Sequence, residues 1–307
     1  MNTVARTPEV DPLYAQPLSE RPAYATGMLL DAQDFADEQT YHRVQLARAM
    51  AFLAGGGTLA GLRVTHQIAT TGADAVPEEI RVEPGLAVDR LGRLIELPRP
   101  ACLRLPRWYD AQNAIDGGDT LKRSAYADLN RFLSARAIAE AAGVPDRAVV
   151  ADVFLRFVAC PRGLTPSFAA GPFDALNAVS TSRVRDAYEL LLIPRERLDN
   201  DHDGLPAAPG AIAIGDPTAA PAVRRAALQD AVLAAYAASV RSGNAGQLER
   251  LLEQPTGLDP TAVFIARTLI PVAAGDPPVR QGDAVLVDGW RRRFLPSASL
   301  LAQWTGI

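Results

Sequence analysis

Three aspartates that alternate along one predicted loop have the types and spacing that come closest to a metal site. Asp199, Asp201 and Asp203 precede Gly204 in the pattern D-x-D-x-D-G, which is the first half of an EF-hand calcium loop. Carboxylates at alternate positions can surround a hard cation, and the glycine permits the sharp turn. Gly210, however, stands where the complete loop needs a bidentate glutamate. We therefore expect a solvated acidic turn and no cofactor, and calcium binding is the alternative.

The histidines and cysteines do not form a catalytic or zinc-binding pattern. His42 falls on the apolar face of a predicted helix, where a hydrogen-bonded histidine is commoner than a ligand, and His66 lies near the end of a predicted strand. Cys102 and Cys160 lie in apolar runs, so we expect two buried free thiols. The sequence contains no HExxH, nucleophile-elbow, Walker or dinucleotide-binding motif. We therefore expect no catalytic residues.

Two further arrangements have a structural explanation that is simpler than a chemical one. Asp34, Asp37 and Glu38 offer carboxylates for acid–base chemistry, but at the start of a helix they complement the positive end of its dipole. The GGGT segment at 55–58 suggests a phosphate-binding loop, yet it lacks the lysine of such a loop and follows a helix instead of a strand. Neither arrangement predicts an active site.

Composition and charge indicate a globular protein that does not bind nucleic acid. The chain has 307 residues, of which 48% are hydrophobic and 21% charged, and its net charge is −4. Without a basic surplus it cannot neutralise phosphates along a nucleic acid. Arg291, Arg292 and Arg293 form the only dense basic cluster, which we expect to be a solvated edge or a protein-contact patch. No secretory signal or membrane span is recognisable, so we expect a cytoplasmic protein without membrane insertion.

A docking helix over residues 31–54 is the clearest predicted element, and an extended arm at 1–23 precedes it. Asp31 is a suitable N-cap, and the glycines at 55–57 end the helix because they permit positive φ. Residues at helical spacing form one apolar face: Phe35, His42, Leu46, Ala49 and Leu53.

The rest of the chain predicts a single α+β unit at 24–307, with an antiparallel sheet or sandwich as its core. A β-rich region covers 58–106, with alternation at 59–68, two strands joined by a tight turn at 90–92 and a short strand at 101–105. Helical insertions are expected at about 124–142 and 217–254, the latter as helices at 217–241 and 245–253. Further strands are expected at 149–158, 185–193 and in a β return at 261–290, with a long loop at 161–182 and a terminal helix at 296–304.

The segment at 24–64 contains a long motif made up of Tyr24, Thr26, Gly27, Leu29, Leu30, Ala32, Asp34, Phe35, Glu38, Gln39, Tyr41 and His42, then Gly61, Leu62 and Val64. In these residues it resembles a family associated with phage-tail-like contractile injection systems. The family motif is Y-x-T-G-x-L-L-x-A-x-D-F-x-x-E-Q-x-Y-H, followed by a G-L-x-V strand. The segment PGLAVDRLGRLIEL at 84–97 is similar to the family's P-G-x-A-x-D-x-x-G-R-x-I. A departure is AFLAGGGTLAG at 51–61, where the family has a tryptophan-containing turn.

The resemblance implies a non-enzymatic structural or adaptor protein of such a particle, near the baseplate, the tail end or a fibre attachment. It would be made in the cytoplasm and assembled into the particle, or released with it. Its partners would be other particle proteins, and homo-oligomerisation stays open. We expect Tyr24, Phe35, Tyr41 and His42 to fix the helix to the sheet or to a neighbouring subunit.

Two other functions stay open at this point. A carbohydrate- or cell-envelope-binding module would use loop aromatics as a platform, for which the candidates are Trp108, Tyr109, Phe168 and Phe173. The other alternative is a hydrolase whose site the motifs do not reveal.

Overall fold

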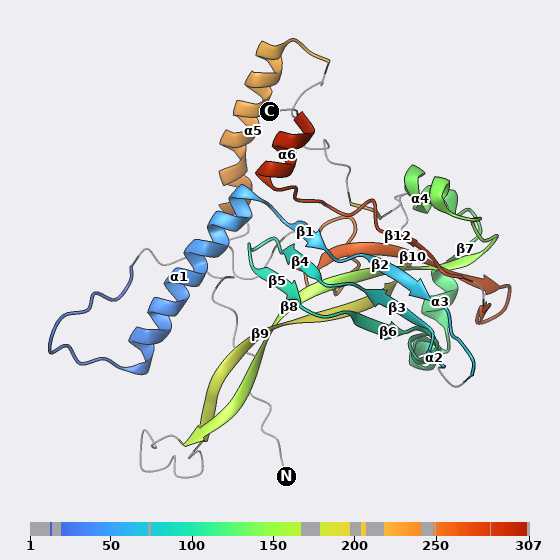
Figure 1. The fold of residues 1–307 in the computed structure, drawn as a ribbon, viewed down its shortest axis with the longest axis horizontal. Coiled ribbons are helices and arrows are strands. Elements are labelled where there is room, and N and C mark those ends of the chain that lie inside the picture. The colour runs from blue at the N-terminus through green and yellow to red at the C-terminus, as the bar shows by residue number, and fades with distance from the viewer. Residues whose placement is uncertain are drawn as a thin grey trace.

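Helices and three antiparallel sheets make up the protein, so the predicted α+β class is confirmed. The computed structural model describes residues 13, 20–72, 75–166, 179–196, 204–206, 218–240, 248, 250–282 and 284–305. The sheets form a body, from which α1 (Ala32–Leu53), α5 (Pro221–Val240) and the outer part of one long hairpin project (Figure 1). These projections carry the surfaces considered below.

The largest sheet has six strands and is built on the hairpin of β8 (Ala148–Pro166) and β9 (Val179–Pro194). β8 pairs on its other side with β10 (Val263–Ala273), whose first ten residues are all buried, as in a strand covered on both faces. The short strands are β7 (Ala125–Tyr126), β11 (Val279–Arg280) and β12 (Leu286–Asp288). The predicted strands at 149–158 and 185–193 and the β return are therefore confirmed.

The two smaller sheets are the halves of one bent three-stranded meander. One half contains β1 (Gly57–Gly61), β4 (Gly85–Val88) and β5 (Leu94–Leu97), and the other contains β2 (Val64–Gln67), β3 (Glu79–Val82) and β6 (Ala101–Arg104). Gly61 pairs with Gly85 and Val64 with Val82, so the register continues across the break. The alternation predicted at 59–68 thus belongs to two strands in two sheets.

The bend needs glycine because two backbones meet there. A Cβ on Gly61, where φ is +63°, would lie 2.1 Å from the Pro84 carbonyl oxygen, and one on Gly85 would lie 2.3 Å from the neighbouring strand. Leu62 also has a positive φ, +55°, a region that costs an L-residue about 1–2 kcal/mol. Its side chain is fully buried, which contributes about 1.5–3 kcal/mol and offsets this strain. The Leu62 carbonyl accepts a 2.6 Å hydrogen bond from Arg292 Nη1.

Local chemistry defines both ends of α1. The Asp31 carboxylate accepts the backbone N–H groups of Gln33 and Asp34, while the Asp34 carboxylate accepts that of Asp31, which makes a capping box. Gly55 follows the last turn with φ of +73°. The remaining helices are α2 (Leu105–Asp116), α3 (Asp119–Arg123), α4 (Ala135–Glu140) and α6 (Ala298–Thr305). The helices predicted at 31–54, 217–241 and 296–304 are confirmed.

Two helix predictions are wrong. The segment at 126–142 continues from β7 into a 3-10 turn at Asn130–Phe132, and only α4 is helical. Leu129, Phe132 and Leu133 turn inward to fill a separate core cluster, and this packing overrides their helix propensity. Of the helix predicted at 245–253, the described residues 248 and 250–253 are not helical, because Arg195 holds the carbonyls of Leu252 and Glu253 against the sheet.

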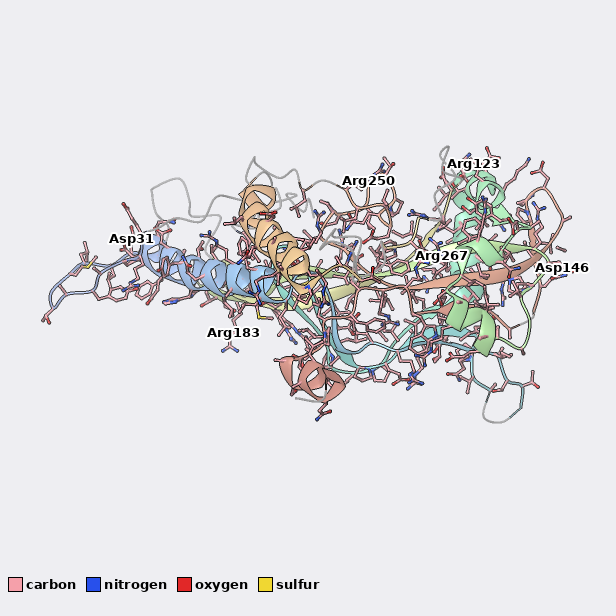
Figure 2. All side chains as sticks on the ribbon, turned by 90° about the horizontal axis from the view of Figure 1, so that it is seen from above. Asp31, Arg123, Asp146, Arg183, Arg250 and Arg267 are labelled. Atoms are coloured by element: carbon pink, nitrogen blue, oxygen red, sulfur yellow. The ribbon has the colours of Figure 1, made fainter. Side chains whose placement is uncertain are left out.

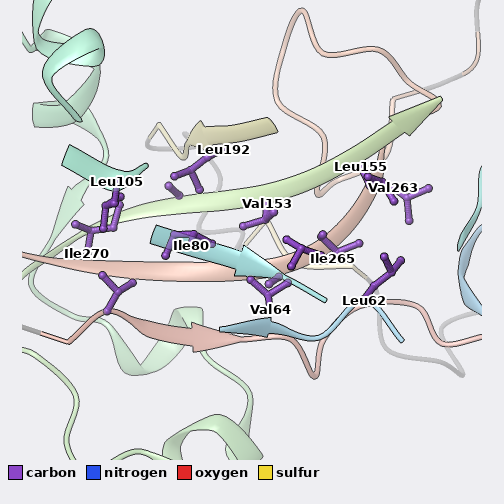
Figure 3. Packing of buried hydrophobic residues seen from close by; sticks show 14 of the residues in the cluster. Leu62, Val64, Ile80, Leu105, Val153, Leu155, Leu192, Val263, Ile265 and Ile270 are labelled. Carbon is purple, nitrogen blue, oxygen red and sulfur yellow. The ribbon is translucent and has the colours of Figure 1, made fainter. Parts of the chain in front are cut away.

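The meander packs face to face on the six-stranded sheet, which we call the central sheet, and this contact forms the main core (Figure 3). Leu62, Val64 and Ile80 lie in one cluster with Val153, Leu155 and Ile265. The odd-numbered residues of β8 from 149 to 157 face this core, whereas Ala148, Val150 and Phe154 belong to two clusters on the opposite face. Both faces of the inner part of β8 are therefore covered.

The loop predicted at 161–182 is wrong at both ends, since residues 161–166 extend β8 and residues 179–182 begin β9; residues 167–178 lie outside the described chain. Glycine and proline in this stretch suggested a loop, but beyond the body the ribbon has no buried face and needs no apolar alternation.

The prediction that both cysteine thiols are buried is also wrong. Cys102 points outward from β6 and Cys160 lies beyond the body, so both are exposed.

Candidate interaction surfaces

The outer part of the β8–β9 hairpin is a two-stranded ribbon that stands clear of the body (Figure 1). We define the β-arm as residues 159–165 of β8 and 181–186 of β9. Its side chains are exposed on both faces, except for half-buried Thr181, whereas residues 148–155 of β8 are all buried. Leu164 and Val184 are 74% and 64% exposed. Among the described residues, the β-arm is therefore exposed along almost its whole length, and Asp186 at its base borders a groove beside α1.

One face of the β-arm carries three arginines, Arg162, Arg183 and Arg185, which we call the arginine face. Arg162 pairs directly with Arg183, and the neighbouring pair on that face is Cys160 with Arg185. Like charges directly opposite each other destabilise a ribbon. None of the three makes an ion pair with another residue that the structure describes, and Arg183 projects into solvent (Figure 2). Sequence reasoning missed this face, although the R-x-R spacing at 183–185 places both side chains on one side of a strand.

Aromatic residues make two separate contacts along the first half of α1. The Tyr24 hydroxyl donates a 2.6 Å hydrogen bond to Glu38 Oε2, and the rings of Tyr41 and His42 meet edge to face with centroids 5.5 Å apart. The Arg21 guanidinium lies 5.7 Å from the Tyr41 ring centroid. Tyr24 thus contacts the second turn of α1, whereas Tyr41 and His42 lie near the middle of the helix.

The first turns of α1 concentrate negative charge. We call the side chains of Asp34, Asp37 and Glu38 the acidic turns. Among the described residues, their hydrogen-bond donors are neutral: the Asp31 N–H, Gln33 Nε2 and the Tyr24 hydroxyl. The hydrogen bond to Glu38 raises the pKa of Tyr24 to about 12, and the charges of Glu38 and Asp34 add to the effect. Within the described chain, no cation pairs with these three carboxylates.

The predicted apolar face of α1 is not the face that the body covers. Phe35, Leu46 and Leu53 are 49%, 67% and 86% exposed, and His42 is exposed, whereas Val44 and Ala47 are buried. Helical spacing identified an apolar stripe but could not show that the body contacts only a narrow part of the helix. Contact of Tyr24, Phe35, Tyr41 and His42 with a neighbouring subunit stays a prediction.

The turn between β4 and β5 seats α1. Gly92 approaches so closely that a Cβ on it would lie 1.7 Å from the Ala47 carbonyl oxygen, and its φ is +84°. The buried Asp89 carboxylate accepts hydrogen bonds from the backbone N–H groups of Leu91 and Arg93 and from Arg93 Nε at 2.6 Å. The residues of the D-x-x-G-R segment thus build a rigid support for the helix.

A groove of about 290 Å³ lies between α1, this turn and the base of the hairpin. Leu46 and Met50 of α1, Leu94 of β5 and Phe157 of β8 give it apolar walls, and Leu13 borders it. The predicted arm at 1–23 falls mostly outside the described residues, which include only 13 and 20–23 of it. Leu13 is the one described residue of the predicted arm that borders the groove.

The prediction of a solvated arginine patch at 291–293 is wrong for Arg292, which is 5% exposed. Arg292 donates from Nε to the Gly289 carbonyl at 2.7 Å and from Nη1 to the Leu62 carbonyl, and burial lowers its pKa to about 10. Arg293 pairs with the buried Glu253, and Arg291 is half-buried. A guanidinium has five donors and satisfies several carbonyls at once. The cluster therefore holds the C-terminal segment to the body.

The calcium candidates Asp199, Asp201 and Asp203 lie outside the described residues. Gly204, which follows them, is described, and its carbonyl accepts hydrogen bonds from Arg195 Nη2 at 3.2 Å and Arg267 Nη2 at 3.1 Å. The described part of the chain contains no cluster of acidic, histidine or cysteine side chains able to hold a metal. Two buried arginines thus hold the end of this loop.

The aromatic platform predicted for glycan binding does not form from its described members. Tyr109 is 4% exposed and donates to the Pro278 carbonyl at 2.8 Å, while Trp108 Nε1 donates to the Leu192 carbonyl at 2.8 Å. Phe168 and Phe173 lie outside the described residues. Both described side chains serve the core.

His66 has a structural role that its sequence position did not reveal. Its Nε2 lies 2.8 Å from Glu78 Oε1, and its Nδ1 accepts the Val285 N–H at 3.0 Å. Glu78 also pairs with Arg280 of β11. Both ring nitrogens are therefore engaged: Nδ1 joins the meander to the segment before β12, and Nε2 contacts Glu78, which pairs with β11.

Comparison with protein-family models gave no match, and comparison with curated proteins gave none. None of the described helices is long and apolar enough to span a membrane. The surfaces above are accordingly interpreted from their own chemistry.

Proposed function

We propose that this protein is a non-enzymatic structural or adaptor component of a phage-tail-like contractile injection particle, in which it joins neighbouring proteins. The observation that carries the proposal is the β-arm, which has both faces exposed. A two-stranded ribbon in water is marginally stable by itself. Packing against a neighbouring protein would complete it, as an assembly component requires.

Exposed apolar residues on two helices support the proposal. On α1, Leu29 next to its cap, Leu46 and Leu53 are 93%, 67% and 86% exposed, and on α5, Val232 and Leu233 are 65% and 77% exposed. Apolar residues scattered singly over a surface need no partner, but their concentration on projecting elements is typical of contact surfaces. The resemblance of the segment at 24–64 indicates the kind of assembly, with the baseplate, the tail end or a fibre attachment as the proposed place.

The proposal is tested directly by measuring whether purified particles contain this chain. We expect particles purified from the producing bacterium to contain this chain in a fixed ratio to the sheath and tube subunits, measured by quantitative mass spectrometry. Deleting the gene should give incomplete particles in electron micrographs. The full chain supplied in trans should restore them.

A matched variant separates the β-arm from the rest of the protein. A chain in which a two-residue turn replaces the segment 159–186 should fold but fail to restore assembly. The proposal is overturned if purified particles lack the chain and the deletion strain assembles normal particles.

A further inference from the structure

We propose that the arginine face of the β-arm binds the acidic turns of α1 in a second copy of this chain. This deepens the proposed function by naming one partner, and it rests on that function for its biological setting. The contact joins two different surfaces, so it is head to tail and would build a ring or a filament.

The arginine face has an uncompensated positive charge. Arg162 and Arg183 lie directly opposite each other, and Arg185 is the next residue of β9 on the same face. Nearer the body, the same face carries Arg156 opposite Glu189, which form an ion pair. On this face an arginine thus lies opposite a glutamate near the body, whereas in the β-arm an arginine lies opposite another arginine.

The acidic turns of α1 concentrate negative charge in the same way. Asp37 and Glu38 lie three and four residues after Asp34, so their like charges are neighbours on the helix surface and repel each other. Three carboxylates here match three guanidinium groups there.

Contact between the surfaces would relieve both repulsions. Guanidinium–carboxylate hydrogen bonds are roughly twice as strong as neutral ones. Exposed apolar residues accompany each surface: Leu164 lies on the arginine face, and Leu29 and Phe35 flank the acidic turns. No ion pair between described residues joins the two surfaces within one chain, and both elements project from the body (Figures 1 and 2). A second copy is therefore the partner that the charges fit.

The test is a charge swap on the full chain, followed by sedimentation velocity over a wide concentration range. The arm-reversed variant carries R162E, R183E and R185E. The helix-reversed variant carries D37K and E38K and keeps Asp34, which completes the capping box. We expect the wild type to self-associate at low salt and less at high salt, because salt screens exposed charges.

Each variant alone should lose self-association, with a dissociation constant raised by roughly tenfold or more, since every 1.4 kcal/mol lost is tenfold. An equimolar mixture of the two variants should associate again, because each reversed surface then meets one of opposite sign. Exposed arginines of the body provide a control: R63E, R99E and R107E change the net charge equally and should leave self-association intact. Circular dichroism and Tm check that every variant is folded.

The inference is overturned if the wild type stays monomeric at low salt, if the arm-reversed variant associates like the wild type, or if the arginine face binds double-stranded DNA instead. A chain that associates as expected but is absent from particles upholds the inference and refutes the proposed function. A chain present in particles whose arm-reversed variant assembles normally refutes the inference alone.

Discussion

Arg267 and Asp152 form a bidentate ion pair inside the central sheet. Arg267 Nε and Nη2 donate to the two carboxylate oxygens at 2.7 and 2.9 Å, and the side chains are 0% and 1% exposed. The two residues are register partners on β10 and β8. Arg195 Nε lies 3.7 Å from the same carboxylate, so one buried anion serves two buried cations.

Asp152→Asn should be strongly destabilising, because it removes the carboxylate that two buried guanidinium groups share. We expect the free energy of unfolding to fall by about 3–5 kcal/mol, measured by denaturant titration. Asp128→Asn at an exposed site is the control and should change nothing measurable. The double variant Asp152→Asn with Arg267→Met should lose less unfolding free energy than the two single variants summed, because it also removes one of the two buried cations. A loss below about 1 kcal/mol for Asp152→Asn would contradict the importance of the pair.

Gly92→Ala should loosen α1. The new Cβ would overlap the Ala47 carbonyl in addition to adopting a positive φ. Gly55→Ala is a matched control, since it has a similar φ of +73° and no atom within 4 Å of its Cβ. We expect the control to cost about 1 kcal/mol and Gly92→Ala clearly more. Amide hydrogen exchange should also be faster along α1 in Gly92→Ala only. Equal exchange in both variants would contradict the claim that the close approach of Gly92 holds α1 in place.

Removing the β-arm should leave the body stable. Val158 and Ala187 are register partners, so an Asn-Gly turn between them would close a shorter hairpin. Because the removed side chains are exposed, we expect the free energy of unfolding to change by no more than about 1 kcal/mol. Thermal and denaturant unfolding measure it. A large loss would mean that the β-arm belongs to the folding unit.

The protein should lose stability at alkaline pH partly through Tyr109. Burial raises the pKa of its hydroxyl from 10 to about 12. A pKa raised by folding gives stability that is present below pH 10 and is lost as pH rises through 12. Tyr109→Phe lacks the hydrogen bond to Pro278 and should be less stable at pH 8, but its decline between pH 10 and 12 should be shallower. Parallel curves for the two proteins would show that Tyr109 ionises equally in both states.

Local chemistry made several elements predictable from the sequence. The capping residues at 31–34 and the glycines at 55–57 defined α1, and β-branched runs at 149–158 and 261–272 defined the buried strands. The turn at 90–92 followed from its glycine. In each case the decisive interaction involves residues close in sequence or a face that is wholly buried.

The interaction surfaces depended on contacts that sequence patterns do not encode. The β-arm has no buried face, so its strands lack apolar alternation and suggested a loop. The buried face of α1 depends on where Gly92 meets the helix, which only the tertiary fold determines. Arg292 belongs to a cluster of charges that was expected to be a solvated edge or a protein-contact patch, but its guanidinium is buried because two carbonyls accept its hydrogen bonds.

The two exposed cysteines give the protein a built-in pair of reporters. Cys102 lies on the body in β6 and Cys160 on the β-arm beside Arg162, and they are the chain's two cysteines. Partial desolvation and the neighbouring Glu79 raise the pKa of the exposed Cys102 thiol, so its labelling should be favoured by mildly alkaline buffer. Spin labels or fluorophores on the unmodified sequence would convert the direction of the β-arm into a measurable inter-label distance. That distance can be followed while the protein enters a larger assembly.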